Sequence, residues 1–175
     1  MIGGALTGAL PRREQPRSGG QSLAVLLGLL VLCLAVGGLG GAITATSLDS
    51  WYQDLNKPVI TPPDWVFGVV WPTLFVLIAV AAWLAWRRAA SGAIAFAGGA
   101  FAMQLVLNTG WTGLFFGARS PMWAFFEALL LLVAIRINQL AFASLDRRAG
   151  WLMLPYLLWV TYACVLTAMV WRLNG

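Results

Sequence analysis

Five long runs of apolar residues make up most of the chain, and short polar stretches separate them. A helix that crosses the hydrocarbon core of a bilayer needs about 20 predominantly apolar residues. Each run reaches this length, so we expect five transmembrane helices, over about 22–47, 64–86, 90–116, 121–143 and 150–171. The pattern predicts an all-α membrane protein. Residues 21–175 would form a five-helix bundle, and residues 1–20 a basic, disordered N-terminal tail.

Polar and helix-breaking residues mark the ends of these predicted helices. Ser120-Pro121 is typical of a helix start, because serine caps the first turn and proline fits within it. We expect Asp64, or alternatively Thr61, to cap the second predicted helix. Arg87-Arg88 is expected to close that helix and Ser91-Gly92 to form the following turn. The fourth connection is expected at residues 146–148.

Composition supports a bilayer as the solvent of this chain. Hydrophobic residues account for 61% of the sequence and charged residues for only 10%, whereas soluble domains carry about 25% charged residues. The net charge of +5 arises from 11 basic and 6 acidic residues. The basic residues lie in the tail and the loops and form no stripe of the kind that binds nucleic acid. We therefore expect no nucleic-acid partner.

The distribution of basic residues predicts an orientation. Five spans place the two termini on opposite sides of the membrane. The N-terminal side carries Arg12, Arg13, Arg17, Arg87, Arg88, Arg147 and Arg148, and the other side carries Lys57, Arg119 and Arg172. In a bacterial inner membrane, the positive-inside rule then predicts a cytoplasmic N-terminus. One lysine against ten arginines favours a bacterial source.

The loop over residues 49–63 is the least membrane-like part of the chain outside the tail. Pro58, Pro62 and Pro63 restrict its backbone, and it also contains Trp51 and Tyr52. A stiff aromatic loop at the mouth of a bundle is typical of a lid. It is equally typical of a connector whose aromatic side chains lie among the lipid headgroups.

Aromatic and polar residues recur within the spans on the lid side of the membrane. At about 1.5 Å per residue, Trp71, Asn108 and Trp159 lie about 10, 12 and 18 Å below that surface. Aromatic walls with a few polar groups suit a flat apolar ligand with a polar edge. A lipid-facing or core position would explain any one of these tryptophans as well.

Polar residues within a membrane span are candidates for function by default. Gln104 and Asn108 are one helical turn apart, so they either bond across helices or face a ligand. The Gly37-xxx-Gly41 spacing allows helices to approach closely and could support a dimer. No chain of carboxylates crosses the predicted bundle, so an ion-coupled pump is not favoured.

Strong metal sites are not expected in this chain. Histidine is absent, which removes histidine-ligated zinc and haem from consideration. The only cysteines, Cys33 and Cys164, are far apart within apolar runs and are interpreted as small buried hydrophobes. We expect no required cofactor and no metal ligands.

Several motifs follow one another in an order and at a spacing that identify a family. They are Trp51-Tyr52, Lys57-Pro58, Pro62-Pro63, Trp65-Val66-Phe67, Trp71, Gln104-Leu105, Asn108, Trp111, Pro155-Tyr156 and Trp159. Over residues 51–174 the chain resembles the TspO/MBR family of tryptophan-rich sensory proteins, also called the translocator protein or peripheral benzodiazepine receptor family.

This resemblance implies a five-helix bundle, usually a homodimer, in a bacterial inner or outer envelope membrane or in the mitochondrial outer membrane. It implies a pocket under the first loop for porphyrins, haem, sterols and benzodiazepine-type compounds. The positions matched to the ligand-binding pocket are Trp51, Tyr52, Pro62, Trp71, Phe75, Asn108, Trp159 and Ala163.

Two functions follow from the resemblance. The first is a membrane tetrapyrrole-binding protein that senses, sequesters or moves protoporphyrin or haem-like ligands. The alternative is an enzyme that degrades porphyrin with light and oxygen, with Trp71 and Trp159 as the catalytic pair.

The chain departs from the family pattern at three places. Thr167 stands where asparagine is frequent. Ala168 and Met169 replace tyrosines of the sterol-recognition stretch of animal members. Thr112-Gly113 stands where prolines are common, which predicts an altered end to the third span.

Overall fold

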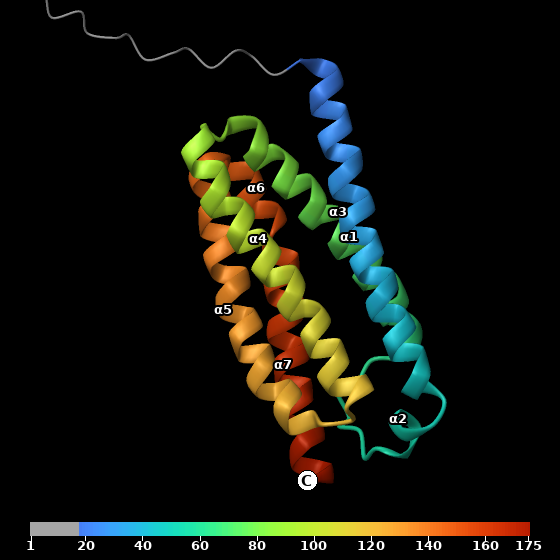
Figure 1. Ribbon diagram of the computed structural model, residues 1–175. Helices are drawn as coiled ribbons and strands as arrows, with labels where there is room; N and C mark the ends of the chain where they lie inside the picture. Colours follow the sequence, from blue (N-terminus) through green and yellow to red (C-terminus); the bar gives the residue numbers. More distant parts are fainter. Residues whose placement is uncertain (1–17) are drawn as a thin grey trace, which may run out of the picture.

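The computed structural model describes residues 18–175. These residues form a bundle of long helices that run roughly along one common direction (Figure 1). The elements are α1 (Gly19–Leu48), α2 (Trp51–Asp54), α3 (Asp64–Arg88), α4 (Ser91–Thr112), the π-helix η1 (Gly113–Gly117), α5 (Pro121–Leu145), α6 (Arg147–Leu152) and α7 (Leu154–Asn174). Five helical segments are long and apolar enough to cross a membrane: Gly19–Leu48, Asp64–Arg88, Gly92–Gly117, Pro121–Leu145 and Arg147–Asn174. The predicted five-span, all-α architecture is confirmed.

Several predicted boundaries shift when the structure is compared with the sequence. The turn before α4 is formed by Ala89 and Ala90, and Ser91 already belongs to the helix, so the predicted Ser91-Gly92 turn is wrong. Pro63, and neither Asp64 nor Thr61, is the N-cap of α3, and no side chain caps that helix. Pro121 does begin α5, as predicted, and Ser120 is its N-cap residue, but the Ser120 side chain makes no capping hydrogen bond.

The last span is divided in two. The fourth connection is the single residue Asp146. Its carboxylate accepts the Arg148 N–H at 2.8 Å and so caps α6, which begins at Arg147. The predicted start at Gly150 is therefore three residues too late. α6 ends before Met153, and α7 begins at Leu154, directly before Pro155. A proline has no N–H to continue a helix, which explains why the break lies there.

The third span ends as a π-helix. α4 passes into η1 at Gly113, and the Ala118 N–H bonds back to the Gly113 carbonyl at 2.7 Å. This change agrees with the altered end predicted from Thr112-Gly113. Single π-turns widen a helix locally and are frequent at functional sites.

The first helix starts with a capping box. The Ser18 hydroxyl accepts the Gln21 N–H at 3.3 Å, and the Gln21 side chain accepts the Ser18 N–H at 3.3 Å. These bonds satisfy donors that otherwise lack partners at a helix start. The helix therefore begins at Gly19, inside the predicted 1–20 tail, and the remaining tail residues 1–17 lie outside the described part of the chain.

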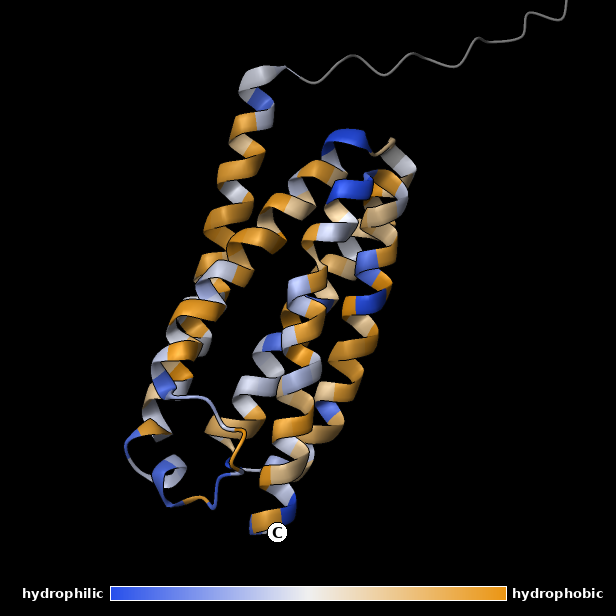
Figure 2. Cartoon of the chain, turned by 180° about the vertical axis from the view of Figure 1, so that it is seen from behind, coloured by the Kyte–Doolittle hydropathy of each residue, from blue (hydrophilic) through white to orange (hydrophobic). Residues whose placement is uncertain are grey.

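Hydrophobic residues run along most of the length of the helices (Figure 2), and many of their side chains are exposed on the outside of the bundle. Val31 and Val106 are each 68% exposed, and Leu130 is 61% exposed. Such a surface would be costly in water and is the normal surface of a helix bundle in lipid. The long helices are therefore oriented across a bilayer, with polar residues mainly at the two ends.

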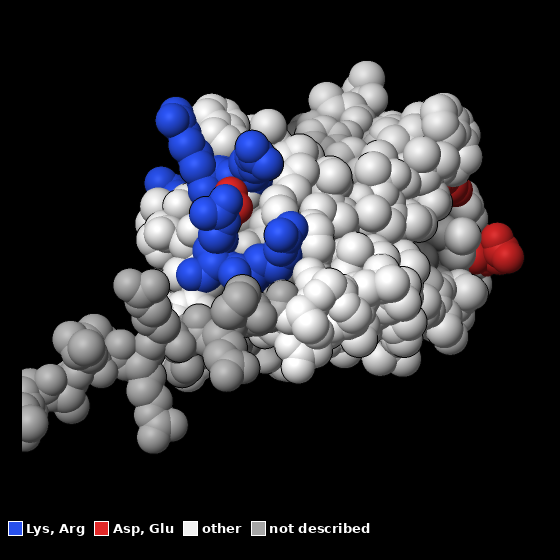
Figure 3. Space-filling model, turned by 90° about the horizontal axis from the view of Figure 1, so that it is seen from above, with Lys and Arg blue, Asp and Glu red and all other residues white. Residues whose placement is uncertain are grey.

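The two ends of the bundle differ in the segments and charged residues that they carry. The α2 loop and the C-terminus lie at one end, which we call the lid end, and the start of α1 lies at the other (Figure 1). Arg87 and Arg88 finish α3, and Arg147 and Arg148 start α6, at the end opposite the lid. Figure 3 looks down on this end and shows basic side chains gathered there. We call it the arginine end.

Candidate functional site

A cavity of about 340 Å³ lies between α1, α3 and the α4–η1 helix near the lid end. Its volume falls in the range of small-molecule sites, about 300–1,000 Å³. Tyr52 of α2 contributes to its lining from the lid, so the loop forms one wall of the cavity. Most of the lining side chains are apolar, with a few polar groups among them.

Helix α1 supplies a wall of small residues. Gly37, Gly40 and Gly41 all line the cavity. A Cβ added at Gly37 would lie 2.7 Å from a ring carbon of Phe75, so only glycine lets α1 and α3 approach this closely. Within the Gly37-xxx-Gly41 motif, Gly37 therefore allows two helices of the same chain, α1 and α3, to pack against each other. The contribution of α1 to the cavity was not predicted from the sequence.

Helix α3 supplies the aromatic wall. Phe67, Trp71 and Phe75 recur every fourth residue, which places them along one helical face. The rings of Trp71 and Phe75 are 5.9 Å apart, and Trp71 lies 6.5 Å from Tyr156 in an edge-to-face arrangement. Because Tyr156 is completely buried, its contact restricts the position of the Trp71 ring.

Helix α4 supplies the buried polar group. The Asn108 amide nitrogen donates to the Tyr156 hydroxyl at 3.0 Å, and Asn108 also lines the cavity. Asn108 therefore combines the two roles considered from the sequence, a bond across helices and a position facing the cavity. Gln104, one turn away, is fully buried, does not line the cavity and has no side-chain hydrogen-bond partner among the described residues.

The lid places a neutral phenol at the cavity. Tyr52 is buried and packs against Phe115 and Phe116, while the Lys57 ammonium lies 4.3 Å from the centre of its ring. Burial, and to a smaller extent the Asp64 carboxylate, raises the pKa of Tyr52 to about 12. The hydroxyl is therefore protonated at neutral pH and can donate a hydrogen bond.

The eight predicted binding residues divide into two groups. The structure brings Tyr52, Trp71, Phe75 and Asn108 together around the cavity. The other four, which do not line it, are Trp51, Pro62, Trp159 and Ala163.

The residues of the second group lie behind or beside the wall. The Trp51 ring packs 5.6 Å from Phe115 in an edge-to-face arrangement. Trp159 packs 5.7 Å from Phe67, so it contacts the wall from behind. Pro62 is half-buried in the loop, and Ala163 is half-buried in α7. Of the two tryptophans considered as a catalytic pair, only Trp71 faces the cavity.

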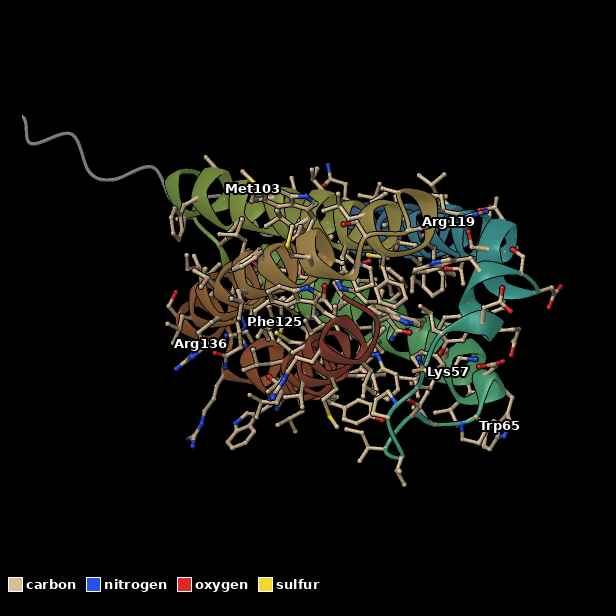
Figure 4. All side chains as sticks on the ribbon, turned by 90° about the horizontal axis from the view of Figure 1, so that it is seen from below. Lys57, Trp65, Met103, Arg119, Phe125 and Arg136 are labelled. Carbon is tan, nitrogen blue, oxygen red and sulfur yellow. The ribbon has the colours of Figure 1, made fainter. Side chains whose placement is uncertain are left out.

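The polar side chains of the cavity include the hydrogen-bonding groups of Tyr52 and Asn108. Within residues 18–175, no three histidine, cysteine, aspartate or glutamate side chains form a group that could hold a metal ion. Seen from the lid end in Figure 4, Lys57 lies in the lid loop, whereas Trp65 and Met103 lie at the periphery of the bundle. Trp65 is 70% exposed, which makes it a lipid-side tryptophan unconnected with the cavity.

These features define a multi-pass integral membrane protein with an aromatic-walled cavity beneath a structured loop. Residues 29–172 match the model of the TspO/MBR family. The chain therefore belongs to the TspO/MBR family.

Curated relatives support this assignment across most of the chain. The chain is 36% identical to the tryptophan-rich protein TspO of Chlorobaculum tepidum, over 87% of this chain and 96% of the relative. It is 37% identical to the tryptophan-rich sensory protein of Cereibacter sphaeroides, over 86% and 92%. It is also 35% identical to the Homo sapiens translocator protein, over 71% and 75%.

Proposed function

We propose that this protein binds tetrapyrroles such as protoporphyrin within the membrane, and that it senses, sequesters or moves them. The cavity between α1, α3 and α4, with aromatic walls and one buried amide, is the observation on which this proposal is based. A flat macrocycle offers a large apolar face and a few polar substituents at its edge. Those are the properties that such a cavity complements.

Contact of the macrocycle with the aromatic wall, through buried area and ring stacking together, would supply most of the binding free energy. Trp71 and Phe75 present rings on the same face of α3, and aromatic pairs contribute about 0.5–1.5 kcal/mol beyond the burial of their area. Gly40 and Gly41 add no side-chain bulk to the opposite wall, so a planar group would lie beside them, away from the close contact between Gly37 and Phe75. The macrocycle would insert edge first from the lid end.

Polar groups would set the orientation of the ligand. The protonated Tyr52 hydroxyl and the Asn108 side chain offer hydrogen bonds at two different depths in the cavity. Lys57, positioned over the Tyr52 ring, would attract the carboxylates of a protoporphyrin toward the lid. The absence of histidine removes the strongest axial ligand for iron, so iron-free porphyrin should bind about as well as haem.

A protoporphyrin titration of the purified protein in detergent tests this proposal. We would follow tryptophan quenching in the dark for the wild type, Trp71→Phe and Trp65→Phe. Loss of the indole at the cavity should weaken binding by about two- to tenfold. The same substitution at the lipid-facing Trp65 should leave affinity unchanged and serves as the matched control.

Each outcome of the titration distinguishes the functions. Saturable quenching that weakens only in Trp71→Phe, with an unchanged porphyrin spectrum under light, supports a binding protein. Light-dependent loss of porphyrin, with a new product that Trp71→Phe lacks, would favour the porphyrin-degrading enzyme instead. Absence of saturable quenching, or a strong preference for haem, would contradict the proposal.

A further inference from the structure

A second cavity, of about 130 Å³, lies near the arginine end, between α1, α3, α4 and α5. Its walls are formed by aliphatic and aromatic side chains, among them Val25, Ala82, Ala85, Phe101 and Leu145. It shares no lining residue with the cavity beneath the lid. Nothing in the proposed tetrapyrrole site uses it.

The first half of α1 and the N-terminal half of α4 both line this cavity, and Figure 1 shows these two helices diverging toward the arginine end. Its lining runs along α3 from Ala82 to Ala89, a length of about 10 Å at 1.5 Å per residue. Because Leu23 and Leu27 of the neighbouring α1 turns are more than half exposed, this region adjoins lipid. An apolar groove of this length that opens to the bilayer suits the first part of an acyl chain.

Positive charge lies at the same end of the bundle as the groove (Figure 3), although no arginine among the described residues lines the groove itself. Arg87 and Arg88 fall between the lining residues Trp86 and Ala89, and both are exposed. Arg147 and Arg148 start the neighbouring α6, which packs against α3. Asp146 is the one acidic residue at this end in the described chain, and it lies 3.7 Å from Arg88. The basic charge is therefore only partly neutralised.

The position of Arg87 is defined by its contacts. Its guanidinium lies 4.8 Å from the Trp83 ring, and the Trp83 indole donates to the Ser22 carbonyl of α1 at 2.9 Å. This chain of contacts joins α1 to α3 and holds a cation at the arginine end of the bundle, where the groove also lies. Basic pockets between transmembrane helices bind anionic lipid headgroups.

We propose that this groove is a binding site for one anionic phospholipid. One acyl chain lies between α1 and α4, and the phosphate contacts Arg87 and Arg88. The combination selects the occupant: the apolar lining accepts hydrocarbon, and the arginines favour a headgroup with net negative charge over a zwitterionic one. The site is independent of whether a tetrapyrrole binds beneath the lid.

Native mass spectrometry of the full chain tests the headgroup part of the proposal. The probes are palmitoyl-oleoyl phosphatidylglycerol and the phosphatidylcholine with the same chains. A basic residue near an anionic membrane surface contributes about 1 kcal/mol, or about fivefold in affinity. Arg87→Gln with Arg88→Gln should therefore weaken retention of phosphatidylglycerol by about five- to twenty-five-fold. Arg119→Gln with Arg172→Gln removes the same charge from the lid end and should have no effect.

A second pair of variants tests the acyl-chain part. Gly98 lines the groove, and a Cβ added there meets nothing within 4 Å. Gly98→Leu should therefore fill the groove and reduce retention of both phospholipids. Gly99 is equally open but does not line the groove, so Gly99→Leu should retain them. Equal Tm values for the two variants would show that folding is unaffected.

The proposal is overturned by any of three results. These are equal retention of phosphatidylglycerol and phosphatidylcholine by the wild type, equal losses in the two arginine double variants, and equal retention by Gly98→Leu and Gly99→Leu. If the Gly98→Leu protein fails to fold, the arginine comparison alone decides the outcome. A dark protoporphyrin titration of each variant keeps this test separate from that of the tetrapyrrole site.

Discussion

Asn174, at the end of α7, binds both backbone groups of Asn56 in the lid loop. Its side-chain oxygen accepts the Asn56 N–H at 2.9 Å, and its amide nitrogen donates to the Asn56 carbonyl at 3.0 Å. The same nitrogen also donates to the Val170 carbonyl within α7, and this bond restrains the Asn174 side chain. The loop is thus attached to a helix 118 residues away in sequence, and it lies over the cavity as a lid.

Removing this attachment should loosen the lid without unfolding the bundle. A typical intramolecular hydrogen bond contributes about 0.5–1.5 kcal/mol, and Asn174→Ala removes two of them. The substitution should therefore speed hydrogen exchange at the Asn56 amide and raise the protoporphyrin dissociation rate by at least about fivefold. Exchange mass spectrometry and stopped-flow quenching measure the two effects. Leu173→Ala, a neighbouring exposed position, is the control. Unchanged exchange in Asn174→Ala would show that the lid is held elsewhere, for example by the Tyr162 hydroxyl on the Ile60 carbonyl.

The close approach of α1 and α3 gives a second prediction. A methyl group at Gly37 would meet the buried Phe75 ring at 2.7 Å, whereas one at Gly38 meets nothing within 4 Å. Overpacking costs about 1–3 kcal/mol, while alanine in place of glycine favours a helix by about 0.5–1 kcal/mol. Gly37→Ala should therefore have a lower Tm than Gly38→Ala and should push the Phe75 ring toward the cavity, weakening protoporphyrin binding. Equal Tm values and affinities would contradict this account of Gly37.

The helices could be predicted from the sequence because a bilayer imposes their length. Five apolar runs predicted five spans, and only their ends shifted by a few residues, as at Arg88 and Leu145. Which helices pack against each other, and through which faces, was not predictable in the same way. Lipid is as apolar as the bundle interior, so a membrane helix need not carry a polar outer face. The glycines of α1 consequently gave no sign that they form a wall of the cavity.

The same physical reason limited prediction of the site. Trp71 and Trp159 both lie deep in apolar helices, and hydropathy does not show which one faces the cavity. Asn108 was identifiable because a polar side chain inside a membrane requires a partner. Its partner, Tyr156, lies 48 residues away on α7 and could not be assigned without the packing of the helices.

The Asn108–Tyr156 hydrogen bond can be measured with a double-mutant cycle. Tyr156→Phe leaves the Asn108 amide without its partner, and Asn108→Leu leaves the phenol without its donor. Hydrogen bonds between membrane helices contribute about 0.6 kcal/mol on average and about 1.7 at most. The double variant should therefore be more stable than the sum of the single losses predicts, by an amount in that range. Strict additivity of the three unfolding free energies would mean that the bond contributes nothing net.

The environment of Tyr52 predicts a shifted titration. Burial raises its pKa from 10.0 to about 12, so its protonated form is favoured by folding. The stabilisation this provides is complete below pH 10 and is lost as the pH rises through about 12. Subtracting the ultraviolet phenolate titration of Tyr52→Phe from that of the wild type should give a midpoint near 12. A midpoint near 10 would show that the ring is exposed and that the lid does not bury it.

The charge asymmetry between the two ends predicts an orientation that can be measured by cysteine labelling. Ala90, between α3 and α4, is exposed at the arginine end, and Val59 in the lid loop is fully exposed. Native Cys33 and Cys164 are both buried, so background reaction should be low. By the positive-inside rule, in a bacterial inner membrane an impermeant maleimide should label Val59→Cys in intact spheroplasts and Ala90→Cys only after lysis. The reverse pattern would place the lid, and with it the entrance to the cavity, in the cytoplasm.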